Sequence, residues 1–255
     1  MRALFAFFKK ELLEALRTWK LLLTVALFFL FGAMNPAIAK ITPWLMEMMS
    51  DALAESGMNV AIVESNALSS WAQFFKNIPM ALIAFVLIFG GTFTKEYSSG
   101  TLVLLLCKGL ARYKVILAKT VTLIALWTLG YFFSYAVTCF GTSIFWETEL
   151  PHLTAAVLCY YLFGVFVIAL TVLCSILTSN YGLVLLGTGG AVLVCYLLGI
   201  IPYVNEYLPT MLLDSTSLLL GASAPEDYTK ALIVTAVLSV AAIAASVPLF
   251  RKKRI

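Results

Sequence analysis

The sequence predicts an all-α, polytopic membrane protein: a single transmembrane domain over residues 1–255, with six transmembrane helices and an N-terminal amphipathic helix at the membrane interface. Of the 255 residues, 62% are hydrophobic and 12% are charged, whereas a soluble domain is about half hydrophobic and about a quarter charged. The mean hydropathy is +0.99, and five long stretches contain no Asp, Glu, Lys, Arg or His. This pattern excludes a water-soluble domain, a coiled coil, a disordered tail and a disulfide scaffold.

The uncharged stretches give the number of crossings. They cover residues 21–39, 77–94, 120–146, 153–205 and 231–250. Because a helix needs about 20 residues to cross the hydrocarbon layer, the first, second, third and fifth stretches each form one crossing. The fourth is long enough for two, and the turn-forming residues at 178–182 predict a tight hairpin inside it.

The first 20 residues are expected to form a cytoplasmic amphipathic helix in the headgroup plane. Its apolar face is formed by Leu4, Phe5, Phe8, Leu12, Ala15 and Leu16, and charged side chains occupy the other faces. A soluble amphipathic helix packed on a partner is the alternative. The interfacial helix is favoured because Lys20 leads directly into the first crossing.

Two outer loops have structure signals of their own. In the loop at 40–76, we expect a short helix with Thr42 as its cap, Pro43 at its first position and Gly57 after its end. The loop at 205–230 is half apolar. It is expected either to re-enter the membrane or to fold on the surface.

The basic residues predict the orientation of the chain. Six crossings place both termini and the second and fourth loops on one side, which holds 14 of the 17 Lys and Arg residues and nets +11. The opposite side nets −7. The positive-inside rule therefore predicts a multi-pass protein of a cell membrane with both termini in the cytoplasm. The overall charge of +4 does not indicate a nucleic-acid partner.

No catalytic, cofactor or metal site is predicted on this chain. The crossings contain no Asp, Glu, Lys, Arg or His, which disfavours an ion-coupled transporter or an intramembrane acid–base enzyme. His152 near Glu147 and Glu149 is more typical of a solvated loop than of a metal site. The cysteines lack metal-binding spacing, and there is no phosphate-binding loop of the GxxxxGKS/T type. If the protein moves cargo uphill, another chain must supply the energy.

The loop at 95–119 is the candidate functional segment. Six apolar residues at 102–107 lie between charged ones, so they need burial against headgroups or a protein. The loop has a motif E-x-x-x-G-T-x-x-x-L-L followed by Arg and Lys, formed by Glu96, Gly100, Thr101, Leu105, Leu106, Arg112 and Lys119. With this motif, the chain resembles the permease subunits of type-2 ABC exporters.

This resemblance implies a separate ABC-type ATPase subunit that binds ATP and docks on the loop. It also implies a second permease copy or paralogue, and a prokaryotic cell membrane. At these positions, Gly100 permits a tight turn, and Thr101 either caps or satisfies a freed amide. Lys108, Arg112 and Lys119 hold the loop at the anionic inner leaflet; enforcing topology alone is the alternative for these cations. Glu96 is predicted to transmit motion through a salt bridge, either to the partner or to the N-terminal helix.

The predicted function is therefore the permease subunit of an ATP-driven exporter. The uncharged crossings suit amphipathic or hydrophobic cargo, although the sequence does not select one compound. A non-transporting immunity or sensor protein of the membrane is the alternative function.

Overall fold

A computed structural model describes residues 2–54, 65–101, 111–147 and 149–252. These ranges contain helices and no strands, and six of the helices are long and apolar enough to cross a membrane, as predicted. Those six are α2 (Lys20–Ala54), α3 (Ala67–Phe89), α6 (Arg112–Phe145), α7 (Leu153–Leu177), α8 (Tyr181–Leu198) and α11 (Thr229–Lys252). The shorter elements are α1 (Arg2–Arg17), α4 (Thr92–Ser98), α9 (Pro202–Asn205), η1 (Pro209–Leu213), α10 (Ser215–Leu219) and η2 (Pro225–Tyr228).

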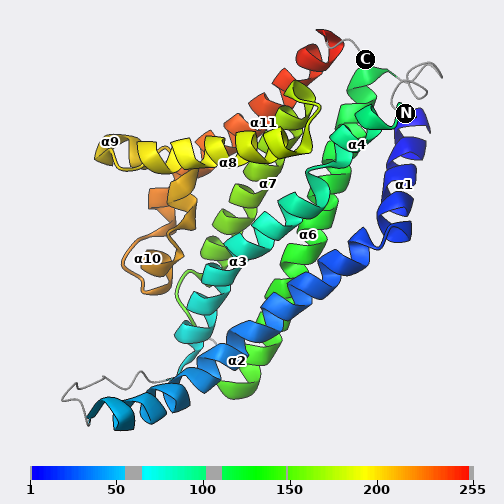
Figure 1. Ribbon diagram of the computed structural model, residues 1–255. Coiled ribbons are helices and arrows are strands. Elements are labelled where there is room, and N and C mark those ends of the chain that lie inside the picture. Colours follow the sequence, from blue (N-terminus) through cyan, green and yellow to red (C-terminus); the bar gives the residue numbers. More distant parts are fainter. Residues whose placement is uncertain (1, 55–64, 102–110, 148, 253–255) are drawn as a thin grey trace.

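The long helices form a bundle whose two ends differ. The start of α1, all of α4 and the end of α11 lie at one end, which we call the terminal end (Figure 1). In the bundle, α2 packs on α6 and α3, while α11 packs on α7. The helix predicted for the first 20 residues is present as α1, which packs on α6 and α2.

Aromatic side chains fill the centre of the bundle. Trp127 of α6 is buried and contacts the rings of Phe28 and Phe85, each at a centroid distance of 5.7 Å. Gly164 of α7 allows this packing, because a Cβ atom there would lie 2.2 Å from the Trp127 ring. The indole also donates a hydrogen bond of 3.3 Å to the carbonyl of Tyr161. α6 and α7 therefore depend on a glycine for their close approach.

A polar network joins three crossings. The Asn77 amide of α3 donates to Asn35 of α2 at 2.7 Å, and the Asn35 amide donates to Thr138 of α6 at 2.9 Å. All three side chains are buried. Because lipid offers no hydrogen-bond partners, these groups stabilise the bundle by satisfying one another.

The expected capped helix in the first outer loop is wrong, because α2 continues through Thr42 and Pro43 to Ala54. Thr42 donates back to the Ile38 carbonyl instead of capping. Pro43 has no amide for the carbonyl four residues earlier, and the Ser65 hydroxyl donates to that carbonyl, on Ala39, at 3.0 Å. The loop expected at 40–76 is also shorter, since α3 begins at Ala67.

The carbonyl that Pro36 leaves without a helical donor is also satisfied by a hydroxyl from another segment. Pro36 leaves the Gly32 carbonyl without its helical donor, and the Thr138 hydroxyl donates to this oxygen at 3.0 Å. Gly141 leaves room for the proline ring, since a Cβ atom there would lie 2.6 Å from Pro36 Cγ. Both prolines therefore remain inside one helix, because neighbouring segments supply hydroxyl donors.

The segment after α8 packs on the bundle. It contains α9, η1, α10 and η2, and it buries Leu212, Leu218 and Tyr228. The Tyr160 hydroxyl of α7 donates to the Leu213 carbonyl at 2.8 Å and holds η1 in place. The segment is therefore a folded part of the domain, and its re-entry into the membrane stays a prediction.

Candidate functional site

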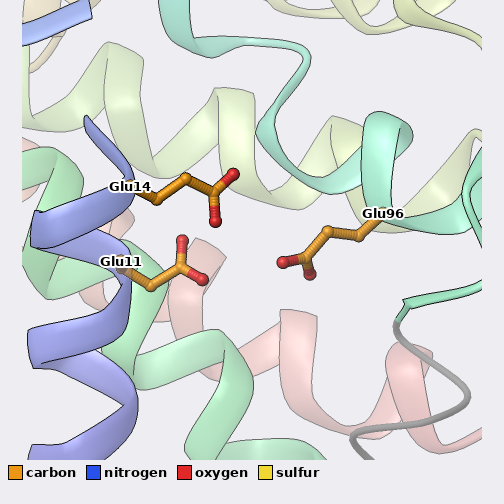
Figure 2. Close-up of side chains that lie close together, drawn as sticks. All are labelled: Glu11, Glu14 and Glu96. Atoms are coloured by element: carbon orange, nitrogen blue, oxygen red, sulfur yellow. The ribbon is translucent and has the colours of Figure 1, made fainter. Parts of the chain in front are cut away.

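Three carboxylates and two ammonium groups meet at the terminal end. Lys10, Glu11 and Glu14 come from α1, Glu96 from α4 and Lys119 from α6. We call these five residues the charge cluster. Figure 2 shows Glu11 and Glu14 on α1, with Glu96 reaching toward them from the opposite side. The helical spacing of 10, 11 and 14 presents all three α1 side chains toward α4 and α6.

Each lysine bridges carboxylates from two helices. Lys119 Nζ lies 2.9 Å from Glu11 Oε2 and 3.1 Å from Glu96 Oε1. Lys10 Nζ lies 3.0 Å from both Glu11 Oε1 and Glu14 Oε2, and 3.2 Å from Glu96 Oε1. Glu96 Oε1 therefore accepts both cations, and it is the point at which α4 is joined to α1 and α6.

The centre of the cluster is buried. The side chain of Lys119 is 1% exposed, that of Glu11 is 5% exposed and that of Glu96 is 9% exposed. Phe93 lies beneath the Lys119 ammonium, which is 5.4 Å from the ring centroid. Buried charges of this kind are tolerated only when each has a partner of opposite sign. The cluster therefore holds α1 on the bundle only while it is complete.

The partly exposed members of the cluster have shifted pKa values. Burial alone would lower the pKa of Lys10, but Glu11, Glu14 and Glu96 outweigh it and raise this pKa above its ordinary value of 10.5. Burial alone would raise the pKa of Glu14, but Lys10 outweighs it and lowers this pKa below 4.5. Both groups are therefore held in their charged forms.

The three carboxylates also resemble a cation site, since single oxygens of Glu11, Glu14 and Glu96 lie within 4.8 Å of one another. The ammonium groups of Lys10 and Lys119 already bridge these oxygens. A divalent ion would have to displace at least one of them. The donor set is therefore better satisfied as an ion-pair network than as a metal site.

The seven residues predicted from the motif do not form one cluster. Glu96 and Lys119 are paired, whereas Arg112 donates to the Phe250 carbonyl at 2.7 Å and to that of Arg251 at 3.2 Å, at the end of α11. Gly100 has a φ of +67°, a conformation that favours glycine and agrees with the predicted turn. Thr101 is exposed, and its hydroxyl is 2.9 Å from that of Ser99. Leu105 and Leu106 lie outside the described residues.

One expectation for Glu96 is confirmed and one boundary is wrong. The salt bridge from Glu96 to the N-terminal helix is present through Lys10. Lys119, expected in the loop at 95–119, lies inside α6, which begins at Arg112. The sequence analysis does not single out Glu11, because a carboxylate in an amphipathic helix is ordinarily expected on the polar face. Phe7, Glu11 and Ala15 are all buried, and their spacing of four residues was the signal that could have shown this.

An apolar cavity of about 340 Å³ lies between α3, α7 and α8. Its walls include Leu82 and Val86 of α3, Phe163 and Val167 of α7, and Val192 of α8. Of the described residues that line it, none is ionisable except Tyr196. The cavity is therefore suited to an apolar group.

A family model described as ABC-2 family transporter protein matches residues 5–213 of the chain. The chain belongs to the ABC-2 transporter family. The match begins in α1 and ends with η1, so it includes every member of the charge cluster. A comparison with curated proteins finds no match. The ABC-2 permease is a membrane component, and the resemblance to this family predicted from the coupling motif is confirmed.

Proposed function

We propose that this permease forms the membrane pathway of an ATP-driven exporter and docks a separate ATP-binding subunit at its terminal end. The charge cluster is the observation that carries this proposal. It joins α4, which leads into the predicted coupling residues, to α1 and α6 through ion pairs of 3.2 Å and 3.1 Å. A displacement of α4 therefore acts directly on two other helices.

The position of α4 supports this role. It has seven residues and begins after Gly90 and Gly91, where α3 ends. A short helix beyond a break can tilt without bending the crossing to which it is joined. Glu96 is on this helix, four residues before Gly100. An ATPase that pushes the segment after Gly100 would move Glu96, and Glu96 would pull Lys10 and Lys119.

The terminal end is proposed to face the cytoplasm, where ATP is available. The charge asymmetry of the loops supports this orientation. In a background without the five native cysteines, Ser99→Cys should react with a membrane-impermeant thiol reagent only after permeabilisation, and Glu149→Cys should react in intact cells. The reverse labelling pattern would place the coupling segment away from ATP and exclude the exporter.

We further propose that the cargo is hydrophobic or amphipathic. We also propose that the pathway includes a second permease copy or paralogue. The apolar cavity between α3, α7 and α8 supports such cargo. The outer face of α8 supports a second copy or paralogue, because only Val184 and Thr188 of this helix are buried. An apolar surface of this extent requires lipid or another protein.

The decisive experiment is copurification of the permease with an ATPase in mild detergent, followed by its ATPase rate in proteoliposomes. We expect the permease to hydrolyse no ATP alone. Glu96→Gln should retain the bound ATPase but lose the permease-dependent change in its rate. The matched control is Glu206→Gln, which removes an exposed ion pair with Lys230 of 2.8 Å and should behave as the parent. If no ATPase copurifies, the non-transporting membrane protein becomes the better interpretation.

A further inference from the structure

A second pocket opens at the terminal end, and it is basic. It has a volume of about 680 Å³. It lies between the start of α2, the junction of α3 and α4, and the turn that precedes α8. Its polar lining consists of Lys20, Thr94, Lys95, Ser179, Asn180 and Tyr181. No Asp or Glu is among the described residues that line it.

Tyr181 fixes one wall of this pocket. Its hydroxyl donates to the Leu87 carbonyl at 2.7 Å. This oxygen lies in the last turn of α3, where helix carbonyls need partners from outside the helix. The ring lies against the glycine pair at the end of α3, since a Cβ atom on Gly91 would be 3.3 Å from Tyr181 Cδ2. The wall of the pocket formed by Tyr181 is therefore held in place by a hydrogen bond and by packing against α3.

The charge of the pocket comes from two lysines on different helices. Lys20 is partly buried, and its ammonium lies 5.7 Å from the centroid of the Phe89 ring. It forms no ion pair with a described residue, although it also lines a smaller cavity beside Glu11 and Glu14. Lys95 is exposed on α4. Two cations that share one pocket repel each other, and an anion between them would remove this repulsion.

The apolar side of the pocket indicates the kind of anion. Leu87 and Ile88 line it together with the lysines, and Leu22 and Leu23, exposed at 55% and 54%, follow Lys20 along α2. The surface therefore changes from cationic to apolar within a turn of helix. A phospholipid has the same order of groups, with its phosphate beside its acyl chains.

We propose that this pocket binds the phosphate of an anionic phospholipid headgroup, with Lys20 and Lys95 as its cationic ligands. The volume lies within the range of about 300–1,000 Å³ that is usual for ligand sites, and basic pockets between membrane helices are suited to anionic headgroups. The assignment to the cytoplasmic leaflet rests on the orientation given with the proposed function. The bound headgroup would contact α4 next to Glu96, and so it would lie against the helix that joins the charge cluster.

The test is lipid retention measured by native mass spectrometry. The full-length permease is purified in micelles that contain equal amounts of phosphatidylglycerol and phosphatidylcholine. We expect the parent to retain phosphatidylglycerol preferentially. Each lysine near a lipid surface contributes about fivefold in affinity, so the double variant Lys20→Gln/Lys95→Gln should lose about 25-fold.

Two further variants separate charge from folding. Lys20→Arg/Lys95→Arg keeps both charges and should retain the lipid, whereas loss of the lipid here would overturn the assignment. Lys114→Gln removes a cation at the same end but outside the pocket and should behave as the parent. Equal retention of phosphatidylglycerol by the parent and the double Gln variant would also overturn the proposal.

Excess inorganic phosphate distinguishes the two sources of the anion. If the pocket holds a lipid, phosphate should leave most of the phosphatidylglycerol bound, because phosphate lacks the apolar contacts. If phosphate displaces the lipid completely, the lipid assignment is wrong and the lysines hold a free anion. None of these measurements depends on ATP hydrolysis or transport, so they can fail or succeed independently of the exporter proposal.

Discussion

Lys119→Met tests whether the charge cluster holds α1 and α4 on the bundle. Methionine has a similar length and fills the same space, so the change removes mainly the charge. Glu11 and Glu96 then lose contacts of 2.9 Å and 3.1 Å. The remaining cation is Lys10, whose side chain is 44% exposed. The net charge of the cluster falls from −1 to −2.

The expected loss is large because the carboxylates remain buried. Removal of one partner from a buried ion pair costs about 3–5 kcal/mol, most of which is the penalty for the charge left behind. At about 2–4 °C per kcal/mol for a chain of this size, the midpoint of thermal unfolding should fall by roughly 10 °C. Adding Glu96→Gln should recover part of this loss, because it removes one of the unpaired charges.

Thermal unfolding in detergent measures the midpoint, and spin labels at Leu16 of α1 and Tyr113 of α6, both exposed, report whether α1 stays docked. Lys114→Met is the matched control, because Lys114 lies on the same helix without an ion pair to a described residue. A midpoint within about 1 °C of the parent for Lys119→Met, with an unchanged label distance, would refute the reasoning.

Three further changes have expected outcomes. Gly164→Ala places a Cβ atom 2.2 Å from Trp127, and thermal unfolding should show a loss of about 1–3 kcal/mol or more. Asn35→Leu breaks the polar network of α2, α3 and α6, and the same assay should show a loss of about 1–2 kcal/mol. The label distance between α1 and α6 should be constant between about pH 5 and pH 10. The distance should lengthen when the pH falls below 4.5, the ordinary pKa of Glu, and reaches the lowered pKa at which Glu14 is protonated. It should also lengthen when the pH rises above 10.5, the ordinary pKa of Lys, and reaches the raised pKa at which Lys10 loses its proton.

Controls are available for each change. Gly189→Ala is the matched control for Gly164→Ala, because a Cβ atom on Gly189 would lie more than 4 Å from the described residues beyond its neighbours in the helix. Equal losses from the two changes would contradict the packing argument. A neutral Asn35→Leu would show that the network contributes little to stability. For the pH series, Glu14→Gln should remove the acid limb, and its persistence would assign that limb to another carboxylate.

The number of crossings could be predicted from the sequence, whereas their ends could not. The thickness of the hydrocarbon layer sets a minimum uncharged length, and this length together with the turn-forming residues at 178–182 identifies the six helices. Helix ends depend on which charges are buried or exposed. Lys76 lies inside α3 and Lys119 inside α6, although a charge normally marks the limit of a crossing. The continuous helix through Pro43 likewise depends on a hydroxyl from Ser65, which local sequence does not reveal.

The candidate site could be predicted only in part. The coupling motif identified Glu96, and the N-terminal helix was one of its two predicted partners. The motif could not show that Lys119 is buried, because its partner Glu11 is 108 residues away in the chain. Arg112 is expected to hold the loop at the leaflet, which stays a prediction, and the hydrogen bonds from its guanidinium to carbonyls of α11 could not be predicted from the motif. Such pairings depend on tertiary structure, which periodicity does not encode.

The small number of buried side chains in α8 has a consequence for how this protein can change over evolution. Since only Val184 and Thr188 are buried in this helix, most of its side chains can be replaced without disturbing the packing of the other crossings. Substitutions there are constrained by hydrophobicity and by whatever the helix faces. New specificities can therefore arise on α8 while the aromatic core and the charge cluster stay the same, so that differences between related permeases should accumulate on this surface first.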